Sequence, residues 1–205
     1  MPVGFAFPYG SQTMQAADWS QPISHQSEQN SKPGRRVVIK RRLDSDEYFV
    51  DIRWNGTAIF ARESSLPKHN YSILTSGQPT LEFTVHFSST PPQDLPSTAN
   101  AFAATEQHWK NFWTTGAAVD FSGSKDPRAK ELERRVVLSQ YVTAIQCSGS
   151  RPPQETGLTT NSWYGKYHLE MHWWHAAQFA LWNRFPLLDR SLDWYNDVLP
   201  SAKAR

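Results

Sequence analysis

The sequence predicts an α+β protein, in which an antiparallel β-sandwich-like N-terminal half is followed by α-helices. Nine of the fourteen prolines lie in the first hundred residues, where they argue against long helices. In residues 80–88 apolar and polar side chains alternate, which is typical of a strand with one buried face. After residue 97 helix start and stop signals recur, and seven of the nine tryptophans follow residue 100.

Length and composition exclude several classes of protein. The 205 residues suffice for one domain, or for one small domain and part of another. Twenty-one Lys and Arg against nineteen Asp and Glu leave a formal charge of +2, which predicts no nucleic-acid partner. No apolar run is long enough to span a membrane, so no membrane partner is predicted either. The lone Cys147 excludes an internal disulfide and a cysteine-rich zinc module.

The first ten residues do not have the pattern of a secretory signal peptide. They contain neither Lys nor Arg, and Pro2, Gly4 and Pro8 interrupt their apolar character. The sequence therefore leaves the cellular location open, and an extracellular form would need a leader that this sequence lacks.

Strand patterns dominate the first predicted region, residues 1–96. Residues 35–40, 47–54 and 80–88 are rich in β-branched and aromatic side chains, and each is expected to form a strand. Residues 58–62 follow the Asn55-Gly56 turn and are expected to pair with 51–54 as a hairpin. The first thirty residues are Gln/Ser-rich and weakly patterned, which predicts an irregular loop or tail.

The second predicted region, residues 97–125, reads as a linker helix and a loop. Ser97 or Thr98 can cap a helix that continues to Trp113, and Gly116 closes it. The helix connects the strand-rich half to the region that holds most of the aromatic residues.

Three further helices are expected in the third predicted region, residues 126–205. Asp126 at the N-cap position and Pro127 at the first helical position begin one helix, which runs to Ile145. Another covers residues 167–183 and stops before Pro186, and a last one covers residues 187–198.

Potential ligand-binding side chains are densest in residues 152–175, which include three histidines. His168, His172 and His175 have the spacing of one helix face, which raises the possibility of zinc or copper. On a straight helix, however, they would span about 10 Å, too far for one ion. The segment also departs from the H-E-x-x-H pattern. The sequence therefore predicts neither a metal nor a cofactor, and favours hydrogen bonding of these histidines within a helix interface.

A saccharide site fits the same segment better, because sugar C–H faces pack on aromatic rings while sugar hydroxyls need polar partners. The alternative is that the tryptophans form a helical core and the polar groups are their satisfied neighbours, and composition does not decide between the two. The candidate substrate-binding residues are Trp163, Lys166, His168, Glu170, Glu155 and Trp173.

Residues 131–184 resemble the opening of the catalytic domain of six-hairpin glycosidases, which fold as (α/α)6 toroids. The segment W-Y-G-K-Y-H-L-E-M, residues 163–171, is also similar to the G-H-x-F-W-D-T-E stretch of maltose and kojibiose phosphorylases. In those enzymes the corresponding acidic residue binds the sugar at the cleaved bond. The resemblance thus places Trp163, Lys166, His168 and Glu170 near substrate. The phosphorylase Trp-Asp pair is replaced here by Leu169-Glu170.

The resemblance implies a glycoside hydrolase-like protein of carbohydrate metabolism whose partner is a neutral glycoside or oligosaccharide. The first half resembles the β-sandwich that precedes such toroids. A toroid has twelve helices, however, and the resembling enzymes carry their general acid beyond the point that corresponds to Arg205. We therefore expect a fragment with its sugar-binding portion present and its catalytic residues unassigned. The alternative is a non-catalytic carbohydrate-binding or interaction module.

Overall fold

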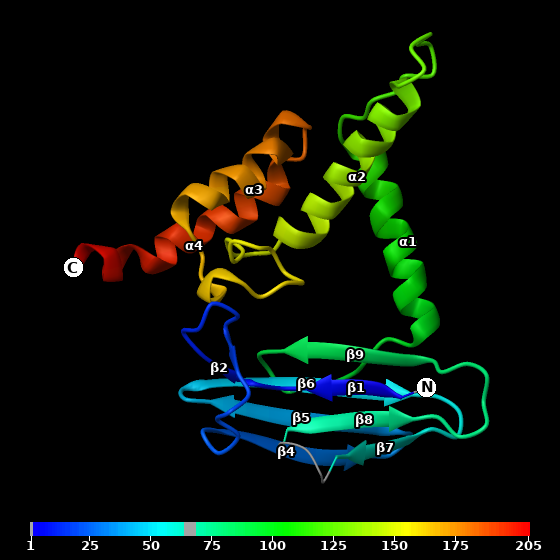
Figure 1. The fold of residues 1–205 in the computed structure, drawn as a ribbon, viewed down its shortest axis with the longest axis vertical. Helices are drawn as coiled ribbons and strands as arrows, with labels where there is room; N and C mark the ends of the chain where they lie inside the picture. The colour runs from blue at the N-terminus through cyan, green and yellow to red at the C-terminus, as the bar shows by residue number, and fades with distance from the viewer. Residues whose placement is uncertain (1, 64–68) are drawn as a thin grey trace. The chain divides into compact units, whose positions relative to one another are not determined.

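A computed structural model describes residues 2–63 and 69–205 and shows the expected α+β order, antiparallel sheets followed by helices (Figure 1). The chain divides into two compact units. A sandwich unit comprises Met1–Ser11 with Ala17–Glu106, and a helical unit comprises Gln12–Ala16 with Gln107–Arg205. The boundary between the two units falls within a helix. The short segment 12–16 is part of the helical unit, although the rest of that unit begins more than ninety residues later, and no sequence pattern predicted this.

In the sandwich unit every described strand pairing is antiparallel. One sheet has the order β4-β5-β6-β9, a second has the order β1-β8-β7, and β2 pairs with β3 alone. The strands are β1 (Val3–Ala6), β2 (Tyr9–Gly10), β3 (Ala17–Asp18), β4 (His25–Lys32), β5 (Arg36–Leu43), β6 (Asp46–Trp54), β7 (Ile59–Arg62), β8 (Asn70–Leu74) and β9 (Phe83–Ser88).

The two larger sheets share one apolar core, which makes the unit a β-sandwich. Val37 and Ile39 of β5 alternate with outward residues, and Val50 and Ile52 of β6 do the same. Their side chains join Tyr71 and Ile73 of β8 in one buried cluster. Full burial of each such side chain contributes roughly 1.5–3 kcal/mol, so this cluster fixes the register of the central strands.

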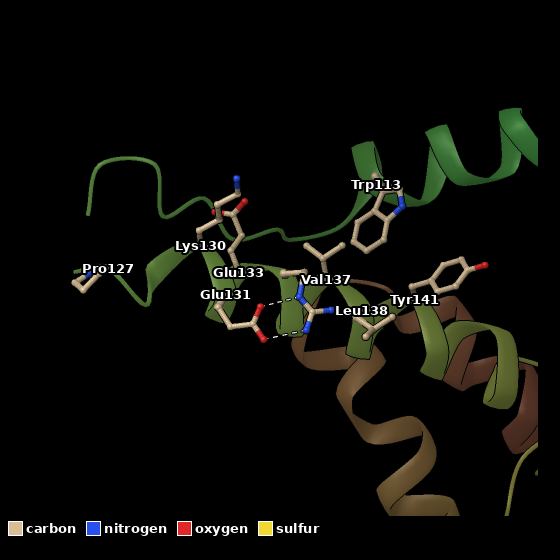
Figure 2. A pocket seen from close by; sticks show the side chains of 9 residues that line it. Trp113, Pro127, Lys130, Glu131, Glu133, Val137, Leu138 and Tyr141 are labelled. Carbon is tan, nitrogen blue, oxygen red and sulfur yellow. Dashed lines mark hydrogen bonds and ion pairs between the residues drawn. The ribbon is translucent and has the colours of Figure 1, made fainter. Parts of the chain in front are cut away.

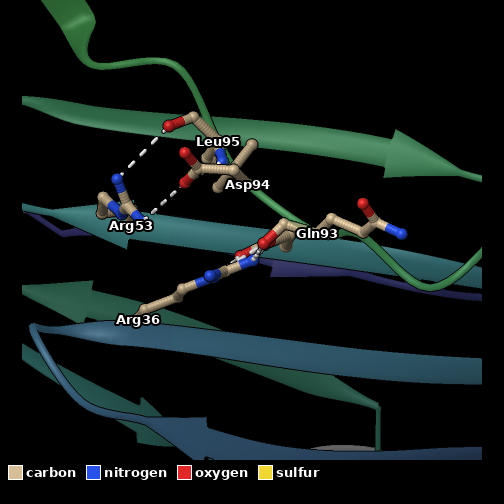
Figure 3. Close-up of polar contacts among 6 residues, drawn as sticks. Arg36, Arg53, Gln93, Asp94 and Leu95 are labelled. Atoms are coloured by element: carbon tan, nitrogen blue, oxygen red, sulfur yellow. Dashed lines mark hydrogen bonds and ion pairs between the residues drawn. The ribbon is translucent and has the colours of Figure 1, made fainter.

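Polar contacts cover the other face of the four-stranded sheet. Arg36 binds the fully buried Asp51 through two nitrogens and reaches the carbonyl of Gln93. Arg53 contacts the Leu95 carbonyl at 3.3 Å and the Asp94 carboxylate at 3.5 Å (Figure 3). Two arginines of adjacent strands thereby fasten the chain segment that leads into the first helix.

A buried guanidinium lies at the β4–β5 end of the sandwich. Arg41 is fully buried and donates to Nδ1 of His25 and, at 3.3 Å, to Nδ1 of His69. Nε2 of His69 donates to the Pro22 carbonyl at 2.8 Å. Since a guanidinium can only donate, each Nδ1 must accept, and both imidazoles are therefore neutral. Burial, and then the neighbouring His69 and Arg41, lower the pKa of His25 to about 4.

The expectation of an irregular first thirty residues is wrong. The structure places β1, β2, β3 and most of β4 there. β4 pairs with β5 along its whole length, but only His25 of its eight residues is buried. An edge strand held by backbone hydrogen bonds has little need for apolar side chains, so its sequence carries no periodic signal.

The prediction of a hairpin between residues 51–54 and 58–62 is also wrong. β7 pairs with β8 in the other sheet, because β6 already has β5 on one side and β9 on the other. The indole nitrogen of Trp54 donates to the Ala58 carbonyl at 2.8 Å, so the chain turns between the sheets here.

The strand expected at residues 80–88 forms as β9, with a smaller buried face than its alternation predicts. Leu81, Phe83 and Val85 pack against the sandwich core, but Phe87 at the strand end is 61% exposed.

The helical elements occur in the predicted order. They are α1 (Thr98–Thr115), α2 (Ala129–Cys147), the short 3-10 turn η1 (Trp163–Gly165), α3 (Leu169–Leu181) and α4 (Phe185–Lys203).

The predicted N-cap holds at α1 but not at α2, whose N-cap is Arg128 and has no side-chain cap hydrogen bond. Ser97 Oγ accepts from the amide of Asn100, as an N-cap does. Asp126 Oδ1 accepts from the amide of Arg128, but Pro127 lies in a turn just before α2. Pro186 does not separate two helices, because it occupies the first turn of α4, where its missing amide hydrogen is tolerated.

The helical core forms around a second buried guanidinium. Phe112, Ala144, Ala176 and Phe179 make up its buried cluster. Arg184, which is 5% exposed, donates to the Phe112 carbonyl of α1 at 3.1 Å and to the Gln140 amide oxygen of α2 at 2.8 Å. Its guanidinium also lies 4.1 Å from the centre of the Phe112 ring. Burial lowers the pKa of Arg184. One side chain from the α3–α4 connection therefore joins α1 and α2.

We expect the stability of the sandwich unit to fall below pH 6.5. Unfolded His25 binds a proton near pH 6.5, whereas folded His25 resists protonation down to about pH 4. The contribution of neutral His25 is therefore complete above pH 6.5 and is lost as the pH falls towards 4, by up to about 3 kcal/mol. His25→Gln keeps an acceptor for Arg41 and cannot titrate. Urea unfolding between pH 7.5 and 5 should show a shallower decline for this variant; equal declines would contradict the assignment.

We also expect Gly116→Ala to destabilise the helical unit by at least about 2 kcal/mol, because a Cβ there would lie 2.4 Å from the central carbon of the Arg184 guanidinium. Gly123→Ala is the matched control, since its Cβ would meet nothing within 4 Å. Thermal unfolding followed by tryptophan fluorescence measures both. Similar midpoints for the two variants would show that Arg184 moves aside without cost.

Candidate functional site

Four of the six predicted sugar-binding residues lie together in the helical unit, in the connection between α2 and α3. The amide of Glu155 donates to the Lys166 carbonyl at 3.1 Å, which draws the two ends of this loop together. The Glu155 carboxylate lies 3.5 Å from Nε2 of His168, an ion-pair distance without hydrogen-bond geometry. The Trp163 and His168 rings contact edge to face, with centroids 6.2 Å apart.

The η1 turn displays two aromatic side chains in a strained conformation. Trp163, Tyr164 and Gly165 have φ angles of 49°, 65° and 62°, the left-handed region that bulky residues rarely occupy. The amide of Tyr164 donates to the Met14 carbonyl at 3.1 Å, so the segment 12–16 supports the turn. Strain of this kind collects at ligand-binding sites and persists only where surrounding contacts hold it.

Glu170 and Trp173 lie instead on the solvent-facing side of α3. They are one helical turn apart, and Trp173 is 71% exposed. Trp174 beside them is 72% exposed. The contacts that join Glu155, Trp163, Lys166 and His168 do not extend to this pair. The predicted residues thus divide into a cluster in the loop between α2 and α3 and a pair on the exposed face of α3.

The tryptophans divide between the two roles that the sequence left open. Trp109 and Trp113 pack against the helical core, as the core interpretation requires. Trp163, Trp173 and Trp174 are exposed, as a binding surface requires. Neither interpretation holds for all of them.

The three histidines do not share one helix face. His168 has extended backbone, with φ −124° and ψ 130°, and lies at the N-cap position just before α3. His172 is buried and His175 follows one turn later. Within the described ranges, no group of three His, Cys, Asp or Glu side chains is placed to hold a metal ion.

His172 lies at the centre of a hydrogen-bond chain between α3 and α4, in agreement with the expected interface role. Ser191 Oγ donates to the Leu188 carbonyl at 2.7 Å, so it must accept from Nε2 of His172 at 2.9 Å. Nδ1 of the neutral ring then accepts from the Tyr195 hydroxyl at 2.8 Å. Tyr195 in turn accepts from the Tyr167 hydroxyl at 2.8 Å.

Burial shifts the pKa values along this chain. It lowers the pKa of His172, with a further decrease from nearby His175. It raises the pKa of Tyr167, and the hydrogen bond to Tyr195 raises it further. The neutral forms of His172 and Tyr167 are therefore favoured. Sequence reasoning missed Tyr167, Tyr195 and Ser191, because these contacts bridge helices and leave no local pattern.

A pocket of the helical unit lies elsewhere, along α2 and the end of α1, with a volume of about 910 Å³ (Figure 2). Trp113, Val137, Leu138 and Tyr141 form its apolar part. At its charged edge, hydrogen bonds from Arg134 and then Arg135 lower the pKa of Glu131 to about 2. None of the six predicted residues lines this pocket. Its lining residues are Trp113, Pro127, Lys130, Glu131, Glu133, Arg134, Val137, Leu138 and Tyr141.

No protein-family model, curated protein or solved structure matches this chain. Among the described residues, none of the helices combines the length and the apolar character required to cross a lipid bilayer.

We expect Tyr164→Asn to leave the stability of the helical unit within about 0.5 kcal/mol of wild type or to increase it, because Asn tolerates the left-handed conformation that strains Tyr164. Tyr167→Asn is the matched comparison in the same loop. It removes a ring packed 4.7 Å from that of Trp194 and should cost about 2 kcal/mol. Urea unfolding measures both; a large loss in Tyr164→Asn would mean that the turn is not strained.

Proposed function

We propose that the helical unit binds a neutral saccharide through the loop that carries η1 and the adjoining exposed face of α3. The observation that supports this most directly is the exposure of Trp163 and Trp173, at 43% and 71%, beside charged side chains. Burial of an indole is strongly favourable, so rings left in water next to hydrogen-bonding groups form a surface suited to a ligand with apolar faces and hydroxyls.

The chemistry of the surrounding side chains fits such a ligand. Glu155 and Glu170 can accept hydrogen bonds from sugar hydroxyls, and Lys166 can donate to them. His168 can do either, according to its tautomer. The Lys166 ammonium lies 5.5 Å from the centre of the Tyr164 ring, where it helps to hold that ring beside Trp163. Charged partners strengthen hydrogen bonds to hydroxyl groups and make the site selective for ligands that satisfy them.

Within this proposal the unit corresponds to the first hairpins of an (α/α)6 glycosidase-like domain. In its support, α3 and α4 form a helical hairpin, held by the chain that joins His172 to Ser191 and Tyr195. A β-sandwich precedes them, as in the proteins that the sequence resembles. The proposal assigns saccharide binding to these residues and assigns no bond-cleaving step.

An interaction module is the second candidate, and the exposed apolar face of α2 favours it. Residues 136–147 carry no charge over three helical turns. Leu138 and Val142 are 46% and 43% exposed on this stretch. A contiguous apolar face of this kind is typical of a protein-binding surface.

Saccharide binding predicts saturable quenching of tryptophan fluorescence by at least one of maltose, kojibiose, cellobiose and xylobiose. Trp163→Ala and Glu170→Ala should each weaken the affinity about tenfold or more, because each removes a ring or a charged hydrogen-bond partner. Trp19→Ala is the matched control: Trp19 is 52% exposed but belongs to the sandwich unit, so its loss should leave the affinity unchanged.

Two outcomes would overturn the saccharide proposal. One is the absence of saturable quenching with all four sugars. The other is equal weakening by Trp19→Ala and Trp163→Ala. A sugar-independent oligomer of defined size that dissociates in Leu138→Lys would instead support the interaction module.

A further inference from the structure

We propose that Tyr195, with His172 behind it, is a positioning residue for the saccharide site: by holding the Tyr167 hydroxyl it orients Lys166 and His168 towards the ligand. The inference rests on the proposed function and extends it to two side chains that do not belong to the predicted set.

The backbone of the loop provides the first step. Lys166 has φ −95° and ψ 148°, and His168 has φ −124° and ψ 130°, so both are extended. In an extended chain alternate side chains point to the same side, and the residue between them points to the other. The contacts fit this alternation, because Tyr167 has its partners on α4 whereas Lys166 and His168 have theirs within the loop.

Contacts on one side of the loop fix Tyr167. Its ring packs edge to face on Trp194 of α4, with centroids 4.7 Å apart, and its hydroxyl lies 2.8 Å from that of Tyr195. These contacts hold Tyr167 against α4. Lys166 and His168 are thereby directed away from α4, where Lys166 lies near the Tyr164 ring and His168 near Glu155.

The hydrogen-bond chain gives the Tyr167–Tyr195 contact a fixed direction. Because Ser191 donates to the Leu188 carbonyl, His172 must donate to Ser191 and accept from Tyr195. The hydrogen of Tyr195 is thus committed to His172, and its oxygen is left to accept from Tyr167. Rotation of Tyr167 away from α4 would leave that oxygen without its donor in a partly buried position, which is unfavourable.

A double-mutant cycle tests this inference with Tyr195→Phe, Tyr167→Phe and the double variant, each of which removes only hydroxyl groups. The affinity for whichever of the four disaccharides binds wild type is measured by fluorescence quenching. Tyr195→Phe should weaken it about fivefold, and should weaken it less than twofold further when Tyr167 is already Phe. Tyr141→Phe on α2 is the matched control and should leave the affinity unchanged.

Hydrogen exchange measured by mass spectrometry provides a readout that needs no ligand. Amide protection in residues 155–168 should fall about fivefold in Tyr195→Phe, while the protection of α2 stays unchanged. A general loss of protection across the helical unit would indicate a merely structural role and overturn the inference.

The two readouts separate the positioning role from the saccharide proposal. If wild type binds a sugar and Tyr195→Phe binds it equally well, the positioning inference is wrong and the proposed function stands. If wild type binds none of the sugars but Tyr195→Phe loosens residues 155–168 alone, the proposed ligand is wrong and Tyr195 still positions the loop. Additive effects of Tyr167→Phe and Tyr195→Phe on affinity would also overturn the positioning role.

Discussion

A guanidinium removed from water must find acceptors within the protein, and the arrangement of the helical unit follows from where Arg184 finds them. Its partners are the Phe112 carbonyl of α1 and the Gln140 side chain of α2. All three helical segments that meet there must keep their positions, since an unmatched buried charge costs several kcal/mol. Four buried apolar residues make a small core for this unit, so the polar contact supplies specificity that packing alone would not.

The sandwich unit uses the same device at Arg41, whose acceptors include two imidazoles in addition to the Gln26 carbonyl and the Ser27 hydroxyl. In each unit a group that can only donate hydrogen bonds imposes one orientation on its neighbours, and around Arg41 it also imposes the neutral form of the imidazoles. Around Arg41 the consequence is sensitivity to acid, because a protonated imidazole would confront the cation. Around Arg184 the acceptors do not titrate, so acid does not disturb them. The fixed position of the guanidinium instead restricts side-chain size, because a Cβ at residue 116 would clash with it.

Sequence reasoning succeeded where the physical signal is local. The β-branched and aromatic residues of β5 and β6, the Ser97 cap and the Asp126-Pro127 start signal identified elements that the structure contains. Sequence reasoning failed at β4, because a strand held at a sheet edge by backbone hydrogen bonds can be polar throughout. It also failed at β7, because the partner of that strand depends on which sheet edges are still unpaired. In the candidate site the clustering of Glu155 with His168 follows from one short loop. The chain from Tyr167 to Ser191 joins residues on different elements, so no spacing rule could have indicated it.

The segment 12–16 has a consequence for how the polypeptide is made. Met14 lies between β2 and β3, yet its carbonyl accepts a hydrogen bond from the amide of Tyr164, far along the chain. During synthesis the segment 12–16 must therefore wait for about 150 further residues before the contact can close, which is slow because loop closure becomes entropically costlier with length. For the same reason a single cut in the chain cannot release the two units intact, and a recombinant helical unit would need those five residues restored by circular permutation.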